Sequence, residues 1–211
     1  MYIQVTNRCN MSCRHCIFDC KVKGQDMPLN IFQKAVEIAS DFDSYITIGG
    51  GEPTLHPDIL WMLGYATMVS EYPIFMVTNG TCSKKTWDIL LRANKFKNLD
   101  VRVSRSIWHN TNKIQDWVWE DCDRYKLWWG EDREILTLVN KGRAKENLKQ
   151  LKDEAYNHFE KVIIEDCDCL TPRIDPLGKV WIDLPESICV GELSEDTISK
   201  AYEIITEYEQ D

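Results

Sequence analysis

The sequence lacks any apolar run long enough to span a membrane, and its N-terminus lacks the charged-then-apolar leader of a secreted protein. We therefore expect no membrane association and a cytoplasmic location. Internal repeats, low-complexity tracts and a linker between two domains are also absent. Because hydrophobic residues make up 44% of the 211 residues, the composition predicts a globular chain with one sizeable core rather than a disordered one.

Positive charge is also scarce. The chain has 25 Lys and Arg residues against 34 Asp and Glu residues, which gives a formal charge of −9. Nonspecific binding to nucleic acid depends on neutralising backbone phosphates with basic side chains. The charge balance therefore makes nonspecific nucleic-acid binding a poor expectation for this protein.

Cysteine, in contrast, is plentiful and partly clustered. The chain has nine cysteines, an odd number, and Cys9, Cys13 and Cys16 form a Cys-x3-Cys-x2-Cys triplet. In a reducing compartment such a triplet indicates metal binding rather than disulfides. Three thiolates can hold an iron–sulfur cubane and leave one iron open to a small molecule. The alternative is a zinc site, with His15 or Cys20 as the fourth ligand that a closed zinc site needs.

Short β-rich runs alternate with helical stretches over the first 165 residues. The candidate strands are residues 2–6, 45–48, 74–78, 99–104, 134–139 and 161–165. The candidate helices are residues 28–41, 57–71, 83–95, 110–128 and 143–158. This alternation predicts an α/β fold with a parallel sheet and helical crossovers. Six such units predict a partial (βα)6 barrel, an open relative of the TIM barrel.

The pattern changes after residue 165. Residues 172–182 predict a β-hairpin that turns at Leu177-Gly178, and a capped helix is expected from about Ser194. We therefore divide the chain into a barrel core over residues 1–165 and a short extension of hairpin and helix over residues 166–211.

Polar motifs stand where the first four predicted strands end. The cysteine triplet follows the first strand, and the others are Gly49-Gly50-Gly51-Glu52-Pro53, Val77-Thr78-Asn79-Gly80 and Val103-Ser104-Arg105-Ser106. Parallel barrels place their function at the C-terminal ends of the strands. Motif placement and architecture therefore predict the same functional edge.

The run from Thr6 to Cys16, followed by these motifs in this order, resembles the radical S-adenosylmethionine (SAM) enzymes. The resemblance extends over residues 1 to about 140 and is to the branch with Twitch- or SPASM-like C-terminal extensions. It implies a 4Fe–4S cluster on Cys9, Cys13 and Cys16, with SAM bound at the fourth iron. It further implies reductive cleavage of SAM to a 5′-deoxyadenosyl radical, which abstracts hydrogen from a second substrate.

The resemblance also assigns residues to the adenine and methionine parts of SAM. His15, together with the backbone near Ile17, would shape the adenine pocket; the alternative is a solvent-facing histidine. The carboxylate of Glu52, or carbonyls beside it, would accept hydrogen bonds from the methionine ammonium. Gly50 and Gly51 would permit close approach, and Pro53 would stiffen the chain. The alternative is an ordinary glycine-rich turn.

Polar residues after later strands complete the implied SAM contacts. Thr78, Asn79, Ser104 and Arg105 would contact the ribose or the methionine carboxylate. Arg105 suits the carboxylate best because its guanidinium can donate at two points. Asn140 would face the adenosine. Ordinary capping of loops or helices is the alternative for each of them.

Two further groups of residues have an open interpretation. Trp108, Trp117, Trp119, Trp128 and Trp129 form either core packing or an aromatic wall for a substrate. Cys167, Cys169 and Cys189 bracket the hairpin, like a shortened form of an extension that holds an auxiliary iron–sulfur cluster. Asp183 stands where that pattern often has another cysteine, and unreactive buried thiols are the alternative.

The sequence thus predicts a radical SAM enzyme whose second substrate it does not name. We favour a peptide or protein side chain, with a small metabolite or nucleotide as the alternative. A glycyl-radical activase and a non-catalytic zinc or iron–sulfur binding module are further alternatives. The expected partner is a reducing electron donor such as flavodoxin or ferredoxin.

Overall fold

A computed structural model describes residues 1–42, 45–96, 98–104, 106, 108–109, 111–125, 127, 135–139, 141–157, 161–165, 169–184 and 186–210. Its main sheet has seven strands in the order β4-β3-β2-β1-β7-β8-β9. The parallel strands at one end are β1 (Tyr2–Thr6), β2 (Ile46–Gly50), β3 (Ile74–Thr78) and β4 (Leu99–Val103). The alternation of strands with helices predicted this parallel arrangement correctly.

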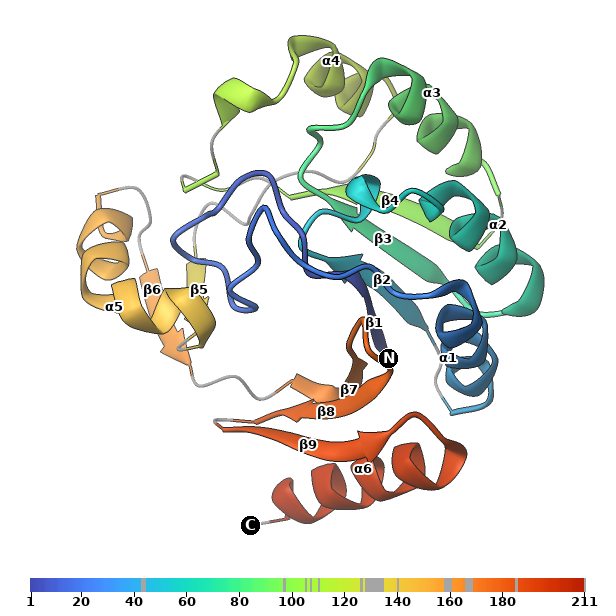
Figure 1. Cartoon of the computed structure of the whole chain (residues 1–211). Helices are drawn as coiled ribbons and strands as arrows, with labels where there is room; N and C mark the ends of the chain where they lie inside the picture. Colours follow the sequence, from blue (N-terminus) through green and yellow to red (C-terminus); the bar gives the residue numbers. More distant parts are fainter. Residues whose placement is uncertain are drawn as a thin grey trace.

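A second sheet stands apart from the first. It consists of β5 (Ile135–Val139) and β6 (Lys161–Glu165), which pair in parallel. Over the described residues no ladder joins β5 to β4, so the sheet does not close. Figure 1 shows this two-stranded unit facing the main sheet across the ring. The architecture is therefore an open, mixed α/β relative of the TIM barrel.

Helices cover the outside of the ring (Figure 1). They are α1 (Leu29–Phe42), α2 (Ile59–Val69), α3 (Lys84–Ala93), α4 (Asp116–Tyr125), α5 (Gly142–Ala155) and α6 (Glu195–Tyr208), with short 3-10 turns η1 (Pro53–Leu55) and η2 (Thr111–Lys113). Ser83 and Ser194 begin α3 and α6 as N-caps, because each hydroxyl accepts a backbone N–H three residues on. Among the described residues, no helix is both long enough and apolar enough to span a membrane.

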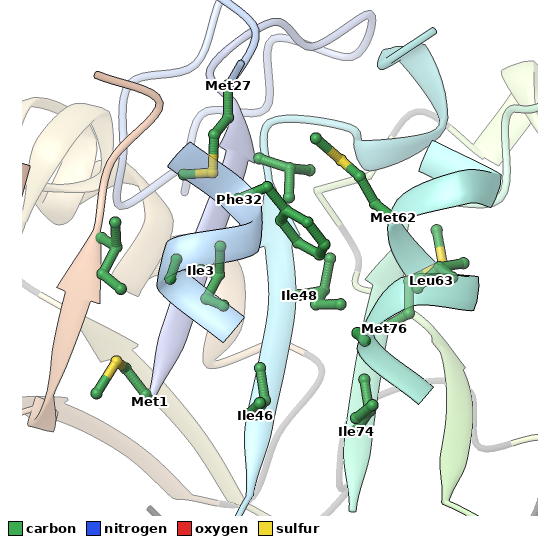
Figure 2. Packing of buried hydrophobic residues seen from close by; sticks show 14 of the residues in the cluster. Met1, Ile3, Met27, Phe32, Ile46, Ile48, Met62, Leu63, Ile74 and Met76 are labelled. Atoms are coloured by element: carbon green, nitrogen blue, oxygen red, sulfur yellow. The ribbon is translucent and has the colours of Figure 1, made fainter. Parts of the chain in front are cut away.

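The main core lies between the parallel strands and their outer helices. Figure 2 shows Phe32 of α1 over Ile48 of β2, with Met62 and Leu63 of α2 beside it. All four side chains are fully or almost fully buried. The apolar spacing along residues 28–41 predicted this buried face of α1 correctly.

The opposite face of β1 is polar. Ile3 and Val5 belong to the hydrophobic core, whereas Gln4 and Thr6 are buried polar residues. Successive side chains of a strand point to opposite faces, so Gln4 and Thr6 face the inside of the ring. The strand therefore carries one face for stability and one face for polar contacts.

The C-terminal strands continue the main sheet. β7 (Cys169–Ile174) and β8 (Lys179–Asp183) form the predicted antiparallel hairpin, with Gly178 at a φ of +77° in the turn. β7 also pairs in parallel with β1, and β9 (Ser187–Glu192), which sequence patterns missed, pairs with β8. The boundary at residue 165 stays a prediction, but both parts share one sheet.

The helix predicted over residues 110–128 begins later than expected. The structure has η2 first, and α4 begins only at Asp116. Just before this segment, the backbone N–H of Trp108 donates to the hydroxyl of Ser106 at 3.3 Å. Local side-chain-to-backbone bonds of this kind favour turns over helix, so the chain reaches η2 through a turn.

Candidate active site

The loop that follows β1 carries the cysteine triplet and folds back on itself. Arg8 donates two hydrogen bonds to the carboxylate of Asp26, at 2.9 and 2.7 Å, and a third to the carbonyl of Leu55 at 2.5 Å. The backbone N–H of Cys9 donates to the carbonyl of Lys21 at 2.6 Å. These bonds join the two ends of the loop to each other and to η1 (Pro53–Leu55).

The three thiols of the triplet are free and differ in their electrostatic surroundings. Burial, together with the neighbouring Cys9 and Cys16, raises the pKa of Cys13 to about 11. Burial likewise raises the pKa of Cys9. The pKa of Cys16 is lowered to about 6, chiefly by a hydrogen bond from the thiol of Cys20. Of the three thiols, Cys16 is therefore the one whose surroundings favour the thiolate.

The glycines of the second motif let two loops approach each other closely. A Cβ on Gly50, whose φ is +146°, would lie 2.2 Å from the carbonyl oxygen of Thr6, and one on Gly51 would lie 2.0 Å from that of Arg8. The backbone N–H groups of Gly51 and Glu52 donate to the same two carbonyls, each at 2.8 Å. The glycines therefore fix the triplet loop against the end of β2.

Glu52 is a fully buried carboxylate that joins three segments. Its Oε1 accepts hydrogen bonds from the backbone N–H and hydroxyl of Thr54, at 3.0 and 2.6 Å, and from the hydroxyl of Thr78 at 2.7 Å. Its Oε2 accepts the backbone N–H of Asn79 at 2.7 Å. Burial raises the pKa of Glu52 against the opposing effect of these donors. With four bonds made, the carboxylate is a connector between loops.

An amide and hydroxyl network extends from Asn79 to the triplet loop. The side-chain amide of Asn79 donates to Oδ1 of Asn10 at 3.1 Å, and that of Asn10 donates to the hydroxyl of Thr81 at 2.7 Å. The Asn79 amide also approaches the sulfur of Cys9, at 3.9 Å. Sequence reasoning missed Asn10, although it lies inside the motif between two of the cysteines.

His15 packs into an aromatic group from the segment after β4. Its ring centroid lies 5.3 Å from that of Trp108 and 4.9 Å from that of His109. Its Nε2 lies 3.5 Å from the hydroxyl of Ser106, and its buried Nδ1 has no hydrogen-bond partner among the described residues. Burial lowers the pKa of His15 to about 3 and that of His109 to about 4, so both rings are neutral at pH 7.

Of the remaining residues predicted to contact SAM, the structure describes Pro53 and Ser104. Pro53 begins η1 directly after Glu52. The backbone N–H of Ser104 donates to the carbonyl of Thr78 at 2.8 Å, which brings the third and fourth motifs together. Arg105 and Asn140 lie outside the described residues.

The four motifs thus meet at one edge of the sheet, as their positions predicted. The family model of the Radical SAM superfamily matches residues 3–118, which is more than half of the chain. This chain belongs to the radical SAM superfamily. That membership indicates an enzyme that uses SAM radical chemistry.

Individual relatives of this radical SAM protein are distant. An S-adenosylmethionine-dependent nucleotide dehydratase from a Thermoplasmatales archaeon (strain ISO4-H5) is 24% identical over 160 residues, which are 76% of this chain and 49% of the relative. The chain therefore spans about half the length of the curated relative that it matches.

Solved structures share the fold at still lower identity. BtrN in an open conformation has a TM-score of 0.55 at 16% identity, over 99% of this chain and 82% of BtrN. SuiB from Streptococcus suis, bound to its precursor peptide SuiA, has a TM-score of 0.53 at 14% identity, over 88% of this chain and 58% of SuiB. These likenesses support an open barrel of the radical SAM type.

The donor set of the triplet loop is three free thiols on one anchored loop. Within the described ranges, no three cysteine, histidine or carboxylate side chains are grouped closely enough to bind one metal ion. Thiolates are the ligands that hold iron–sulfur clusters, and each thiolate of a cubane binds its own iron. The residues present therefore have the donor chemistry that a cluster needs.

The start of α5 contacts the triplet loop, and sequence reasoning missed this contact. Arg143 donates to the carbonyls of Cys13, Cys16 and Cys20, and Gly142 lies directly against the carbonyl of Ile17. The signal that could have found these residues is their position, since Gly142-Arg143 follows the fifth strand as the other motifs follow theirs.

A buried ionic cluster connects α5 to the C-terminal strands. Arg173 donates two hydrogen bonds to the carboxylate of Asp183, at 2.6 and 3.2 Å, and one to the side chain of Gln4 at 3.0 Å. Lys141, the residue before α5, also donates to Asp183. Burial alone would raise the pKa of Asp183, but Arg173 and Lys141 together hold it below its ordinary value.

The candidate auxiliary cysteines are only partly described. Cys167 lies outside the described residues, and Cys169 is placed by its backbone, which pairs with Asp183. Cys189 is exposed on β9, where its backbone pairs with Trp181. The auxiliary cluster stays a prediction. Asp183 is engaged in the ionic cluster with Arg173 and Lys141.

The tryptophans separate into two groups. Trp117 packs against the buried Trp87 with ring centroids 6.1 Å apart, and Trp119 is partly buried against the main core. Both fit the core interpretation. Trp108 instead packs beside His15 at the candidate site, and Trp128 and Trp129 lie outside the described residues.

Proposed function

We propose that this protein binds a 4Fe–4S cluster through Cys9, Cys13 and Cys16 and uses it to cleave SAM reductively. When bound, the cluster supplies the electron that breaks the sulfonium and yields a 5′-deoxyadenosyl radical, which abstracts hydrogen from a second substrate. The observation that carries this proposal is the triplet loop, held by the glycine and Asn79 motifs in a chain of the radical SAM superfamily.

The chain's own residues would position SAM in distinct ways. Glu52 already accepts four hydrogen bonds, so the backbone carbonyls beside it are better acceptors for the methionine ammonium than its carboxylate. Asn79 is held between Asn10 and Thr81, which fixes its side chain towards the triplet loop. His15 stays neutral and packs as an aromatic wall, and the backbone of Ile17 lies on the same loop.

Three further residues complete the proposed SAM site. Ser104 follows β4 and lies beside Thr78, where it would contact the ribose. For Arg105 and Asn140 the proposal rests on their positions after the fourth and fifth strands. A reducing partner such as flavodoxin or ferredoxin would deliver the electron.

Two substrate classes have specific support. The matched curated relative is described as acting on a nucleotide, and it shows the highest sequence identity among the relatives described above. The SuiB structure holds a precursor peptide, and SuiB shares the fold. Deuterium-labelled nucleotides and peptides would separate the two classes, because only the true substrate transfers deuterium into 5′-deoxyadenosine.

Anaerobic reconstitution tests the proposal directly. We expect a brown protein with about four irons per chain that forms 5′-deoxyadenosine from SAM after reduction. Cys13→Ala should abolish this cleavage, whereas Cys82→Ala, which removes a half-buried thiol outside the triplet, should retain it. A colourless protein with stoichiometric zinc would overturn the proposal and support the binding module. About eight irons per chain would support an auxiliary cluster.

A further inference from the structure

The side chain of Arg143 binds the inside of the triplet loop at several points. Its Nη1 donates to the carbonyl oxygen of Cys13 at 2.7 Å and its Nη2 to that of Cys20 at 2.6 Å. Its Nε donates to Oδ1 of Asp19 at 3.0 Å, and its backbone N–H donates to the carbonyl of Cys16 at 2.9 Å. One residue therefore holds the loop before, at and after the third cysteine.

The preceding glycine shows that this contact is built into the chain. Gly142 has a φ of +54°, and a Cβ there would lie 2.3 Å from the carbonyl oxygen of Ile17 and 2.9 Å from that of Cys16. A side chain at this position would separate α5 from the loop. The close approach of Gly142 and the four bonds of Arg143 are independent observations of the same docking.

The contact also places a positive charge beside the loop. The Arg143 side chain is 15% exposed, and Asp19, its ion-pair partner, is 45% exposed. The charge of the guanidinium is therefore less screened by water than that of its carboxylate partner. Charge and hydrogen bonds around an iron–sulfur cluster set its reduction potential, and a nearby cation favours the more negative, reduced form.

We propose that Arg143 is a positioning residue with two effects on the triplet loop. Its carbonyl bonds hold the loop in the conformation that binds the cluster, and its charge makes the bound cluster easier to reduce. The second effect rests on the proposed function, whereas the first concerns the protein before any cluster is bound. A lysine keeps the charge but loses the fork of fixed donors, so substitutions can separate the two effects.

The experiment compares Arg143→Met and Arg143→Lys with Lys145→Met, which removes a positive charge from an exposed position on the same helix. Hydrogen exchange is measured on the protein before reconstitution, at the amides of residues 13–20. We expect exchange to be about tenfold faster in Arg143→Met than in Lys145→Met, because the loop opens more often. Arg143→Lys should also exchange faster than the control.

The reconstituted proteins are then titrated with reductant and followed by electron paramagnetic resonance. At one applied potential, the ratio of reduced to oxidised cluster should fall about tenfold in Arg143→Met, equivalent to about 59 mV for one electron. Arg143→Lys should stay close to the wild type in potential and release iron faster to a chelator.

The outcomes are distinguishable. If both Arg143 variants match Lys145→Met in loop exchange, iron release and potential, the inference is wrong. If the wild type takes up no cluster, the proposed function fails, and the exchange measurement still decides the positioning effect. If Arg143→Met does not fold, as circular dichroism would show, Arg143→Lys decides: faster exchange and iron release than in the control support the inference, and equal rates overturn it.

Discussion

The triplet loop is held on two sides by different kinds of contact. On the motif side, defined by Glu52 with Thr54, Thr78 and Asn79, the Glu52 backbone N–H and the Asn79 amide donate to the loop, at the carbonyl of Arg8 and at Oδ1 of Asn10. The buried Glu52 carboxylate accepts four neutral donors that join these segments to one another. On the helix side, defined by Lys141, Gly142, Arg143 and Glu154, mainly charged groups reach the loop and the C-terminal strands.

This difference has a physical meaning. A buried carboxylate with four donors is rigid, because each lost donor removes a hydrogen bond in a dry site, and loss of the Asn79 N–H would leave Oε2 without a partner. The contacts of the helix side include exposed ion pairs, such as Arg14 with Glu154, whose side chains are 41% and 36% exposed. Such pairs contribute little each. We infer that the motif side holds the loop through buried neutral donors, whereas the helix side holds it through Arg143 and depends on its anchor at Asp183.

The largest effect should come from Asp183→Asn, which removes that anchor. Arg173 and Lys141, each 12% exposed, would then lose their shared carboxylate, and breaking a buried pair costs about 3 kcal/mol. Urea unfolding of the variant should show this loss, and Glu186→Gln, an exposed neighbour, should show almost none. An unchanged free energy of unfolding for Asp183→Asn would show that Asp183 does not anchor the helix side.

The same variant makes a pH prediction. The pKa of Asp183 is lower in the folded protein than its ordinary value of 3.8, so its contribution to stability is complete above that value and disappears as the pH falls through the folded pKa. The difference in unfolding free energy between wild type and Asp183→Asn should therefore be largest near about pH 6 and shrink below about pH 4.

A smaller effect should follow from Glu52→Gln on the motif side. The amide NH2 of the glutamine would point its donors at N–H or hydroxyl groups that donate to the carboxylate in the wild type. We expect a loss of about 2 kcal/mol in unfolding free energy, compared with the exposed charge control Glu71→Gln. A loss no larger than that of the control would show that the motif side is not the rigid one.

The smallest effect should come from Glu154→Gln on the helix side. Glu154 accepts two hydrogen bonds from Arg14, at 3.0 and 2.6 Å, but both side chains reach solvent. A double-mutant cycle with Arg14→Met should give a coupling free energy of about 0.5 kcal/mol that decreases in high salt. A coupling free energy of several kcal/mol would show that the helix side is as rigid as the motif side.

Much of the fold could be predicted because its signals are local. β1, β3 and β6 begin and end at the predicted residues, since each is a short run rich in β-branched and aromatic residues or other apolar residues. β9 and the pairing of β7 with β1 were missed. Pairing between distant strands depends on the packing of the whole chain, which no local pattern contains.

The candidate site divides in the same way. The cysteine triplet and Glu52 lie in compact motifs, and the structure brings the segments that carry them together. Arg143 looks like an ordinary charged residue in the sequence, and Asp183 stood out only as an aspartate in place of an expected cysteine. Their importance comes from partners on distant segments, such as the carbonyl of Cys13 and the ammonium of Lys141. Sequence reasoning therefore did not identify the roles of residues whose partners lie far away in the sequence.

The pairing of β1 with β7 has a consequence for synthesis on the ribosome. Tyr2 and Ile3 are translated well before their partners Arg173 and Ile174. Until then one edge of the first strand has no neighbour, and such an edge can recruit strands from other nascent chains. Production of the protein should therefore benefit from a chaperone that shields β1 until β7 has been made.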